Sequence, residues 1–171
     1  MNTDKPSIHL RAIEPEDLDL LYRIENDVKL WNVGTTNVPY SRYTLHDYVA
    51  HASADIYTDR QVRMMVENEQ REVIGIADVV NFDPGNCRAE VGLIILNACR
   101  RQGYGGRTLE ALAEYALNVL HLHQLFAYID VTNEASLRLF RKMGYETSAT
   151  IKDWLYDGKE YRDAVLVQRV F

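Results

Sequence analysis

Residues 100–108 carry the residue types that could bind an anionic ligand, Arg-Arg-Gln-Gly-Tyr-Gly-Gly-Arg-Thr. They lie between the apolar run 91–96 and a helical pattern over 109–120, so we expect a strand, a glycine-rich turn and a helix. The first turn of a helix leaves backbone N–H groups without partners and carries partial positive charge. Gly103, Gly105 and Gly106 lack side chains, so a phosphate can approach the backbone closely. The segment predicts a site for a diphosphate-bearing ligand; the alternative is a tight turn only.

Two known phosphate-binding motifs do not match this segment. A dinucleotide loop requires G-x-G-x-x-G near the start of a strand–helix–strand unit, whereas Thr108 stands at the third glycine position. A triphosphate loop requires Gly-Lys-Ser/Thr, which the sequence does not contain. The pattern R-x-x-G-x-G (Arg100, Gly103, Gly105) instead resembles the coenzyme A pyrophosphate loop of the GNAT superfamily of N-acetyltransferases.

Composition and length limit the other possibilities. A chain of 171 residues suits one domain, expected over 1–171, and its hydrophobic content of 47% is ordinary for a globular protein. The net charge of −6 disfavours nonspecific nucleic-acid binding. No apolar run is long enough to span a membrane, no signal peptide is recognisable, and no metal-ligand spacing occurs. Two cysteines without a C-x-x-C pattern make a reduced cytoplasmic protein the default.

The elements that position the loop form a continuous series without a linker or repeat. Apolar periodicity predicts an α/β fold of the α+β type, with about seven strands and about four helices around a mixed, mostly antiparallel sheet. Strands are expected at 7–13, 62–67, 73–81, 91–96, 124–131, 147–156 and 159–170, and helices from Glu14, at 44–54, at 109–120 and from Asn133 to Gly144. On the helix at 109–120, the apolar stripe includes Leu117. Asp157-Gly158 indicates a two-residue hairpin turn.

A second motif strengthens the resemblance to the GNAT superfamily. Asn133, Ser136, Phe140 and Gly144-Tyr145 are spaced like the second cofactor element of that family. The closing segment 154–163 is similar to the bacterial branch that contains spermidine N-acetyltransferases and ribosomal-protein N-terminal acetyltransferases. The resemblance implies a single-domain GNAT fold, acetyl-CoA as the acetyl donor, and a homo-oligomer.

In that family two neighbouring parallel strands splay apart, which here implies the strand ending near Leu96 and the strand 125–131. Unpaired backbone groups of the first strand would bond the pantetheine amides, and an N–H there could stabilise charge on the thioester oxygen. The resemblance implies a cofactor site made of Leu93, Ile94, Ile95, Leu96, Arg101, Gln102, Gly103, Tyr104, Gly105, Gly106, Arg107, Thr108, Asn133, Ser136, Phe140 and Lys142. For Arg101, Arg107 and Lys142 the alternative is a solvated surface charge.

Acetyl transfer to an amine requires loss of a proton, because an amine of pKa near 10 is protonated at neutral pH. The family often places a carboxylate at the position of Glu90, and we expect Glu90 to act as the general base. Alternatively, Glu90 anchors a charged substrate or faces outward from its strand.

The departing thiolate presents a second proton problem. Many family members place a tyrosine at position 140 as general acid, but this chain has Phe140. Three explanations stay open: the thiol leaves unassisted or with water, a nearby phenol such as Tyr145 or Tyr104 replaces the donor, or the protein binds acyl-CoA and is slow. A noncatalytic acyl-CoA-binding sensor is therefore an alternative to an enzyme.

The acceptor site is expected between the first helices, where the family forms its acceptor wall. Glu25, Trp31, Asn32 and Tyr40 combine carboxylate and aromatic groups that would suit a small polycation such as spermidine. A protein N-terminus is the rival acceptor, and the same residues could be a buried tryptophan and a solvated acidic surface. Because neither cysteine has a recognisable activating partner, direct transfer without an acyl-enzyme is expected.

Overall fold

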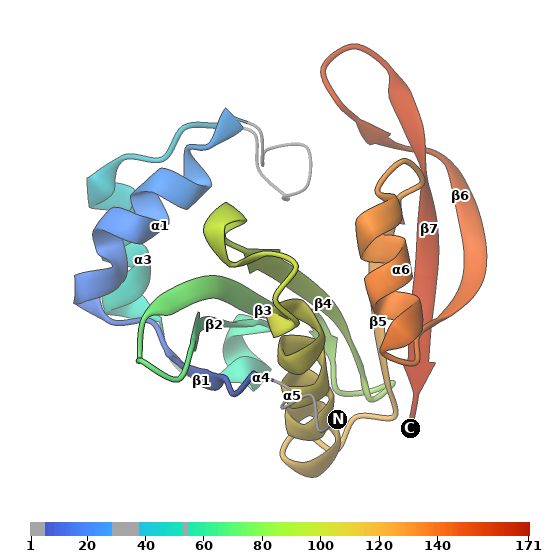
Figure 1. Cartoon of the computed structure of the whole chain (residues 1–171), viewed down its shortest axis with the longest axis horizontal. Coiled ribbons are helices and arrows are strands. Elements are labelled where there is room, and N and C mark those ends of the chain that lie inside the picture. Colours follow the sequence, from blue (N-terminus) through green and yellow to red (C-terminus); the bar gives the residue numbers. More distant parts are fainter. Residues whose placement is uncertain (1–5, 29–37, 53–54) are drawn as a thin grey trace.

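The computed structural model describes residues 6–28, 38–52 and 55–171. Their strands form one seven-stranded sheet with the order β1-β2-β3-β4-β5-β7-β6 (Figure 1). The strands are β1 (His9–Ala12), β2 (Val62–Glu67), β3 (Val73–Asp83), β4 (Arg88–Ile95), β5 (Gln124–Asp130), β6 (Glu146–Tyr156) and β7 (Tyr161–Val170). Only β4 and β5 pair in parallel. The predicted mixed, mostly antiparallel sheet is confirmed.

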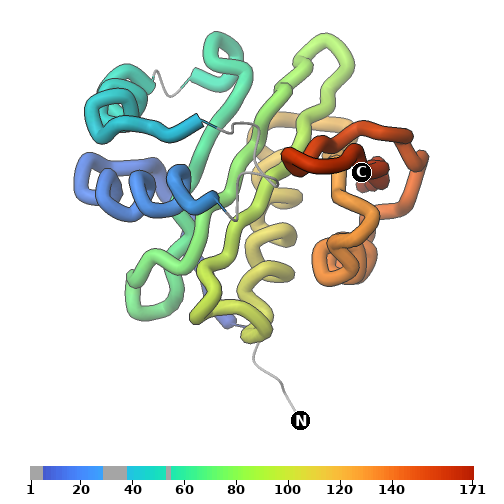
Figure 2. The backbone as a smooth tube through the Cα atoms, turned by 90° about the horizontal axis from the view of Figure 1, so that it is seen from above, coloured from blue at the N-terminus to red at the C-terminus, as the bar shows by residue number. Residues whose placement is uncertain are grey.

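Helices cover both faces of this sheet. They are α1 (Leu18–Glu25), α3 (Arg42–His51), α4 (Ile56–Asp59), α5 (Tyr104–Asn118) and α6 (Glu134–Lys142), with 3-10 turns η1 (Pro15–Asp17) and η2 (Asn97–Cys99). Figure 2 shows the central strands between α1 and α3 on one side and α5 on the other. The short α4 was not expected from the sequence. None of the helices in the described ranges is long and apolar enough to cross a membrane.

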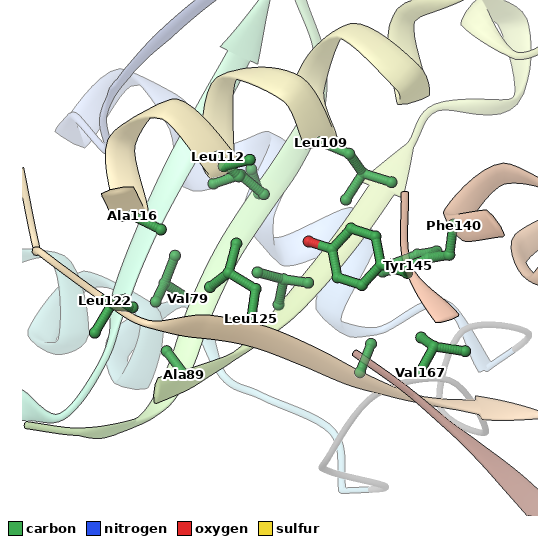
Figure 3. Packing of buried hydrophobic residues seen from close by; sticks show 14 of the residues in the cluster. Val79, Ala89, Leu109, Leu112, Ala116, Leu122, Leu125, Phe140, Tyr145 and Val167 are labelled. Carbon is green, nitrogen blue, oxygen red and sulfur yellow. The ribbon is translucent and has the colours of Figure 1, made fainter. Parts of the chain in front are cut away.

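Alternation along the strands separates two clusters of buried side chains. Ala89 and Val91 of β4 belong to the larger cluster, with Leu109 and Leu112 of α5 (Figure 3). Ile94 instead packs against the smaller cluster under α1 and α3. Because strand side chains alternate between faces, Glu90 and Gly92 share the α1–α3 face with Ile94.

Two sequence-based expectations need correction. Leu117 is 45% exposed, because the buried stripe of α5 follows Leu109, Leu112, Ala113 and Ala116 and turns away before Leu117. The β6–β7 hairpin closes through residues 157–160, since Tyr156 pairs with Tyr161. Its turn is longer than two residues because the Asp157 carboxylate accepts the N–H groups of both Lys159 and Glu160.

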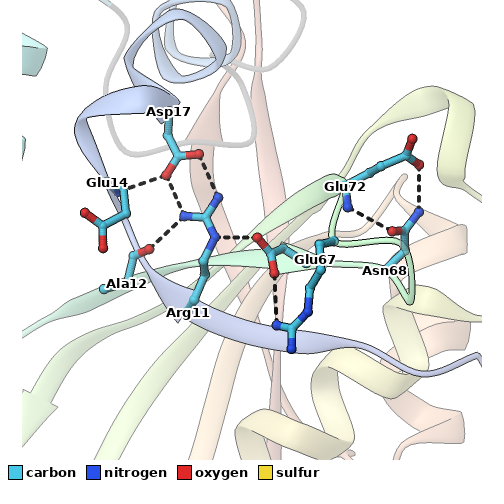
Figure 4. A network of polar contacts seen from close by, with 8 residues as sticks. Arg11, Ala12, Glu14, Asp17, Glu67, Asn68 and Glu72 are labelled. Carbon is cyan, nitrogen blue, oxygen red and sulfur yellow. Dashed lines mark hydrogen bonds and ion pairs between the residues drawn. The ribbon is translucent and has the colours of Figure 1, made fainter.

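An ion network attaches the start of the first helical segment to the sheet (Figure 4). The Arg11 guanidinium donates to both carboxylate oxygens of Asp17, at 2.7 and 2.9 Å, and to Oε1 of Glu67 at 2.5 Å. Asp17 also accepts the Glu14 N–H at 2.9 Å. Asp17 and Glu67 are 6% exposed, so charged groups of β1, β2 and η1 neutralise one another at a largely buried position.

Candidate active site

The parallel pairing of β4 with β5 covers a short stretch. Its register joins Arg88 to Gln124, Ala89 to Leu125 and Glu90 to Phe126, and the ladder ends there. β4 continues along β3 as far as the pair Ile95–Gly75. Beyond Glu90 the two central strands therefore separate, and β4 has a strand neighbour on one side only.

The separation does not expose every backbone group from Leu93 to Leu96. The Leu96 N–H donates to the Ile74 carbonyl at 2.8 Å, and the Leu96 carbonyl accepts the Cys99 N–H at 2.8 Å. Backbone groups alternate in direction along a strand, so Leu93 and Ile95 direct theirs toward the β5 side. The Ile95 carbonyl accepts Nε of Arg100 at 2.9 Å. The backbone of Leu93 and the N–H of Ile95 thus line the gap.

The glycine-rich loop leads directly into α5. Gly103 has φ of 89°, a left-handed conformation that strongly favours glycine, and it is the N-cap. The Arg107 N–H donates to the Gly103 carbonyl at 3.2 Å. The preceding N–H groups, of Tyr104, Gly105 and Gly106, belong to the first turn and have no intrahelical acceptor. The predicted strand–turn–helix arrangement is present.

Gly105 and Gly106 also have a packing role. A Cβ at Gly105 would lie 3.1 Å from Cδ2 of Leu139, and a Cβ at Gly106 would lie 3.1 Å from Sδ of Met143. These neighbours belong to α6 and to the residue that follows it. The glycines therefore let α5 and α6 approach closely, a reason that the sequence analysis did not include.

Some polar side chains around the loop are exposed, and others form ion pairs or hydrogen bonds within the protein. Arg101 and Lys142 are exposed. Arg107 forms an ion pair with Glu110 and donates to the Pro6 carbonyl at 3.3 Å. Three others donate hydrogen bonds within the protein: Gln102 to the Ala98 carbonyl (3.0 Å), Tyr104 to the sequence-distant Glu69 (3.5 Å), and buried Thr108 to the Tyr104 carbonyl (2.9 Å). The Thr108 hydroxyl thus faces into α5, away from the loop surface.

The second predicted cofactor element is α6. Asn133 caps this helix through a hydrogen bond from the Ser136 N–H to its Oδ1, at 3.1 Å. Phe140, near the other end, is 6% exposed and packs edge-on against Tyr145, with ring centroids 4.9 Å apart.

Tyr145 lies in the core rather than at a polar surface. It is 2% exposed, and its hydroxyl has no hydrogen-bond partner among the described residues. Figure 3 shows the hydroxyl pointing into the cluster, toward the side where Leu112 and Leu125 lie. Burial raises the pKa of the Tyr145 phenol well above its usual value. A proton donor to the thiolate is expected at a polar surface, whereas the Tyr145 hydroxyl lies in an apolar site.

Glu90 occupies the last paired position before the central strands separate. Its side chain is half-buried, and burial raises the pKa of its carboxyl, while a hydrogen bond from Asn81 opposes this shift. Nδ2 of Asn81 donates to Oε2 of Glu90 at 2.7 Å. A half-buried carboxylate beside a gap between strands is suitably placed to accept a proton.

A pocket of about 350 Å³ lies on the same face of the sheet as Glu90. It is lined by residues of α1, α3, β2 and β3 with the segments beside them, namely Glu25, Tyr40, Thr44, Leu45, Tyr48, Gln61, Val62, Arg63, Asp78 and Val80. Val80 pairs with Glu90 across β3 and β4, which connects the pocket to the candidate base. Glu25 and Tyr40, predicted to bind substrate, both line it, whereas Trp31 and Asn32 lie outside the described residues.

Sequence reasoning missed the ion cluster at the wall of this pocket. Arg63 donates from Nε and Nη2 to the two oxygens of Asp78, at 2.7 and 3.0 Å, and also bonds Glu25. The sequence signal for this ion cluster was the presence of charged residues within otherwise apolar strands. Arg63 and Asp78 form a pair because they are opposite each other on β2 and β3 and share a face. Among the residues the structure describes, no group of three or more His, Cys, Asp or Glu side chains could hold a metal ion.

Comparison with known proteins identifies the class of protein that has this fold and these separated strands. The family model described as an acetyltransferase (GNAT) domain matches residues 7–146. The chain therefore belongs to the acetyltransferase (GNAT) family and is an N-acetyltransferase.

The individual proteins that this chain resembles have low sequence identity to it. The spermidine N(1)-acetyltransferase of Escherichia coli (strain K12) is 24% identical over 163 residues, which cover 93% of this chain and 83% of that protein. The [ribosomal protein uS5]-alanine N-acetyltransferase of the same organism is 27% identical over 103 residues, 60% of this chain and 53% of that protein. The crystal structure of Vibrio cholerae spermidine N-acetyltransferase in complex with CoA and spermine superposes with a TM-score of 0.85 at 20% identity, covering 95% of each chain.

Proposed function

We propose that this protein transfers an acetyl group from acetyl-CoA directly to a primary amine, with a polyamine such as spermidine as the acceptor. One observation carries the proposal: the β4–β5 ladder stops at Glu90, whose β3 partner Val80 lines the 350 Å³ pocket, and β4 then leads through the glycine-rich loop into the N-terminus of α5. A donor and an acceptor approaching from these two sides would meet beside one carboxylate.

The residues around the gap suit coenzyme A. The backbone groups of Leu93 and Ile95 would bond the pantetheine amides as an added strand does. The N–H groups of the first turn of α5 would hold the pyrophosphate, because they have no intrahelical acceptors and the helix dipole favours an anion. Arg101 and Lys142, both exposed, would reach phosphates. Asn133 and Ser136 at the start of α6 would border the far side of the cofactor.

Acetyl-CoA, when bound, supplies an acetyl group activated as a thioester. Glu90 would draw the proton from the acceptor ammonium, directly or through water, so that a neutral amine can attack. A thiol of pKa near 8.5 is a fair leaving group at pH 7, and we assign no protein acid to it, because the Tyr145 hydroxyl is buried in the core. The free cysteines, Cys87 and Cys99, take no part.

Three features favour a cationic acceptor. The pocket is lined by two carboxylates, Glu25 and Asp78, and by one guanidinium, Arg63, which pairs with both, so the lining carries more negative than positive charge; Tyr40 and Tyr48, which also line it, are residues of the type that contacts cations. Three of the relatives are named spermidine N(1)-acetyltransferases. A peptide N-terminus is the second candidate acceptor, favoured by the relative that acetylates a ribosomal-protein alanine.

We further propose that residues 1–171 form one domain, that the protein acts in the cytoplasm, and that it assembles from copies of itself. The family model covers most of the chain without interruption. A Vibrio cholerae spermidine N-acetyltransferase whose fold resembles this chain has been described as dodecameric.

Thermal unfolding with and without acetyl-CoA tests the cofactor, with NADH and ATP as controls. Ligand at 100 times its dissociation constant stabilises the folded state by ~2.7 kcal/mol, which raises Tm by about 5–10 °C at this size. Thiol release that depends on added amine then tests the reaction, with spermidine and an alanine-initiated peptide compared as acceptors. A shift with NADH or ATP alone would contradict the proposal.

A further inference from the structure

The strand β3 contains an irregularity directly opposite the candidate base. Val80 pairs with Glu90 and Asp83 with Arg88, so Asn81 and Phe82 together face the single residue Ala89. This is the two-against-one count of a β-bulge, a feature that changes the direction of a side chain and is frequent next to active sites.

Because of the bulge, Asn81 and Phe82 each lie on the other face of the sheet from the one that regular alternation predicts. Val79 faces the larger cluster, so alternation would direct Asn81 there and Phe82 away from it. Instead Phe82 is 3% exposed and packs in that cluster, whereas Asn81 lies on the Glu90 face. The Asn81 backbone has φ of 50°, a left-handed conformation that asparagine adopts more readily than most residues.

The carboxylate of Glu90 is held on one side only. Oε2 accepts the amide N–H of Asn81 at 2.7 Å, and no described residue donates to Oε1. The charged side chains that line the pocket on this face are Arg63 of β2, Asp78 of β3 and Glu25 of α1, and Arg63 bonds both carboxylates. β5 presents the ring of Phe126 next to Glu90. Asn81 is thus the neighbouring group in the described part of the chain that fixes how Glu90 is oriented.

We propose that Asn81 is a positioning residue for acetyl transfer: it holds Oε2 of Glu90 so that Oε1 is directed at the amine proton. The amide donates to the ionised carboxylate and not to the protonated oxygen, so it also favours the form that can accept a proton. This inference rests on the proposed function, in which Glu90 is the base.

The test is the pH dependence of kcat/KM, measured by thiol release with acetyl-CoA and spermidine. Asn81→Gly removes the amide and keeps a residue suited to the left-handed backbone. We expect its acidic limb to move upward by about 0.5–1 pH unit, because the ionised carboxylate loses a donor. Asn81→Asp should move the limb further, since a second carboxylate then lies beside Glu90. The KM for acetyl-CoA should not change in either variant.

A matched control uses Asn86, which is also exposed and donates from Nδ2 to a carboxylate, that of Asp83, at 2.8 Å. Asn86→Gly should leave the limb in place. Thermal unfolding of each variant confirms that it is folded, and Asn81→Ser provides a second variant should Asn81→Gly be unstable. In a Glu90→Gln background, Asn81→Gly should cause no further loss of kcat/KM.

The outcomes separate this inference from the function on which it rests. An unchanged acidic limb in Asn81→Gly, together with loss of that limb in Glu90→Gln, would overturn the role of Asn81 and leave Glu90 as the base. Retention of the limb in Glu90→Gln would overturn both assignments. A shift of equal size in Asn86→Gly would show a general effect of the turn and would also overturn the inference.

Discussion

Glu90 lies opposite Phe126 at the last position where β4 and β5 are paired. The candidate base is therefore fixed by two neighbouring strands, while the next residues of β4 have a partner on one side only. A general base needs a constant position and a nearby opening for its substrate. The end of a parallel ladder provides both.

We predict that Glu90→Gln lowers kcat/KM at pH 7 by ~10²-fold or more, within the range of general base catalysis. Burial raises the pKa of Glu90, and only the ionised carboxylate accepts a proton. Activity of the wild type should therefore fall as the pH decreases, at a higher pH than an ordinary glutamate would give. Initial rates of thiol release from pH 5 to 9 check this. Equal profiles for both proteins would exclude Glu90 as the base.

Gly103→Ala should destabilise the protein by ~1–2 kcal/mol, because alanine is strained at positive φ, and should weaken acetyl-CoA binding. Gly158→Ala is the matched control: Gly158 has φ of 93° and no atom within 4 Å of an added Cβ. It should cost less stability than Gly103→Ala, because a Cβ at Gly103 would also lie 3.2 Å from Cδ of Pro6, and it should leave acetyl-CoA affinity unchanged. Calorimetric titration and urea unfolding measure the two effects. Equal affinities in the two variants would show that the loop conformation does not matter for the cofactor.

Tyr145→Phe should raise stability by about 1 kcal/mol, because it removes a buried hydroxyl without a partner. Its kcat should stay within ~3-fold of the wild type, whereas loss of a general acid would lower kcat by ~10²-fold or more. The companion variant Phe140→Tyr introduces a phenol at the position where the family resemblance led us to expect a general acid. An increase in its thiol-release rate would indicate that departure of the thiolate limits this enzyme.

Arg63→Met should destabilise the protein by about 3 kcal/mol, because it removes the guanidinium that Asp78 and Glu25 share at the pocket wall. Adding Asp78→Asn should recover part of this loss, since one buried negative charge is then removed. Urea unfolding of both single variants and the double variant gives the coupling between the two residues. Simple additivity of the two single changes would show that the bidentate pair contributes nothing in solution.

Asp17→Asn should destabilise the protein by about 1–3 kcal/mol at pH 7, since it weakens charged hydrogen bonds with Arg11. Arg11 lowers the pKa of Asp17, so the contribution is present above the unfolded-state pKa near 4 and is lost as the pH falls further. Thermal unfolding at pH 7 and pH 3 should show the difference between the proteins shrinking. Glu134→Gln, in an exposed pair with Arg138, should cost less than ~0.5 kcal/mol.

Local patterns in the sequence predicted most elements of this fold. β2 begins at Val62 and ends at Glu67, as its apolar run indicated, and Asn133 caps α6 as expected. Such features depend on residues near one another in the chain, which periodicity and capping preferences describe.

Features that depend on distant contacts could not be predicted in this way. The close approach of Gly105 to Leu139 requires two helices to be docked, and the Arg63–Asp78 pair requires the register of β2 and β3. The bulge at Asn81 has no marker in the local sequence beyond an asparagine that tolerates positive φ. The roles of the site residues stay predictions, and the variants above test them.

The short ladder between β4 and β5 has a mechanical consequence. Among the described strands, the pairing between the β1–β4 part and the β5–β7–β6 part of the sheet is confined to the three residue pairs from Arg88–Gln124 to Glu90–Phe126. The two parts thus share a short backbone ladder, and the larger buried cluster, which contains residues of β3, β4, β5 and β7, packs them together. A ligand that bonds to both β4 and β5 would bridge the gap between them, and amide hydrogen exchange should then slow on both strands together.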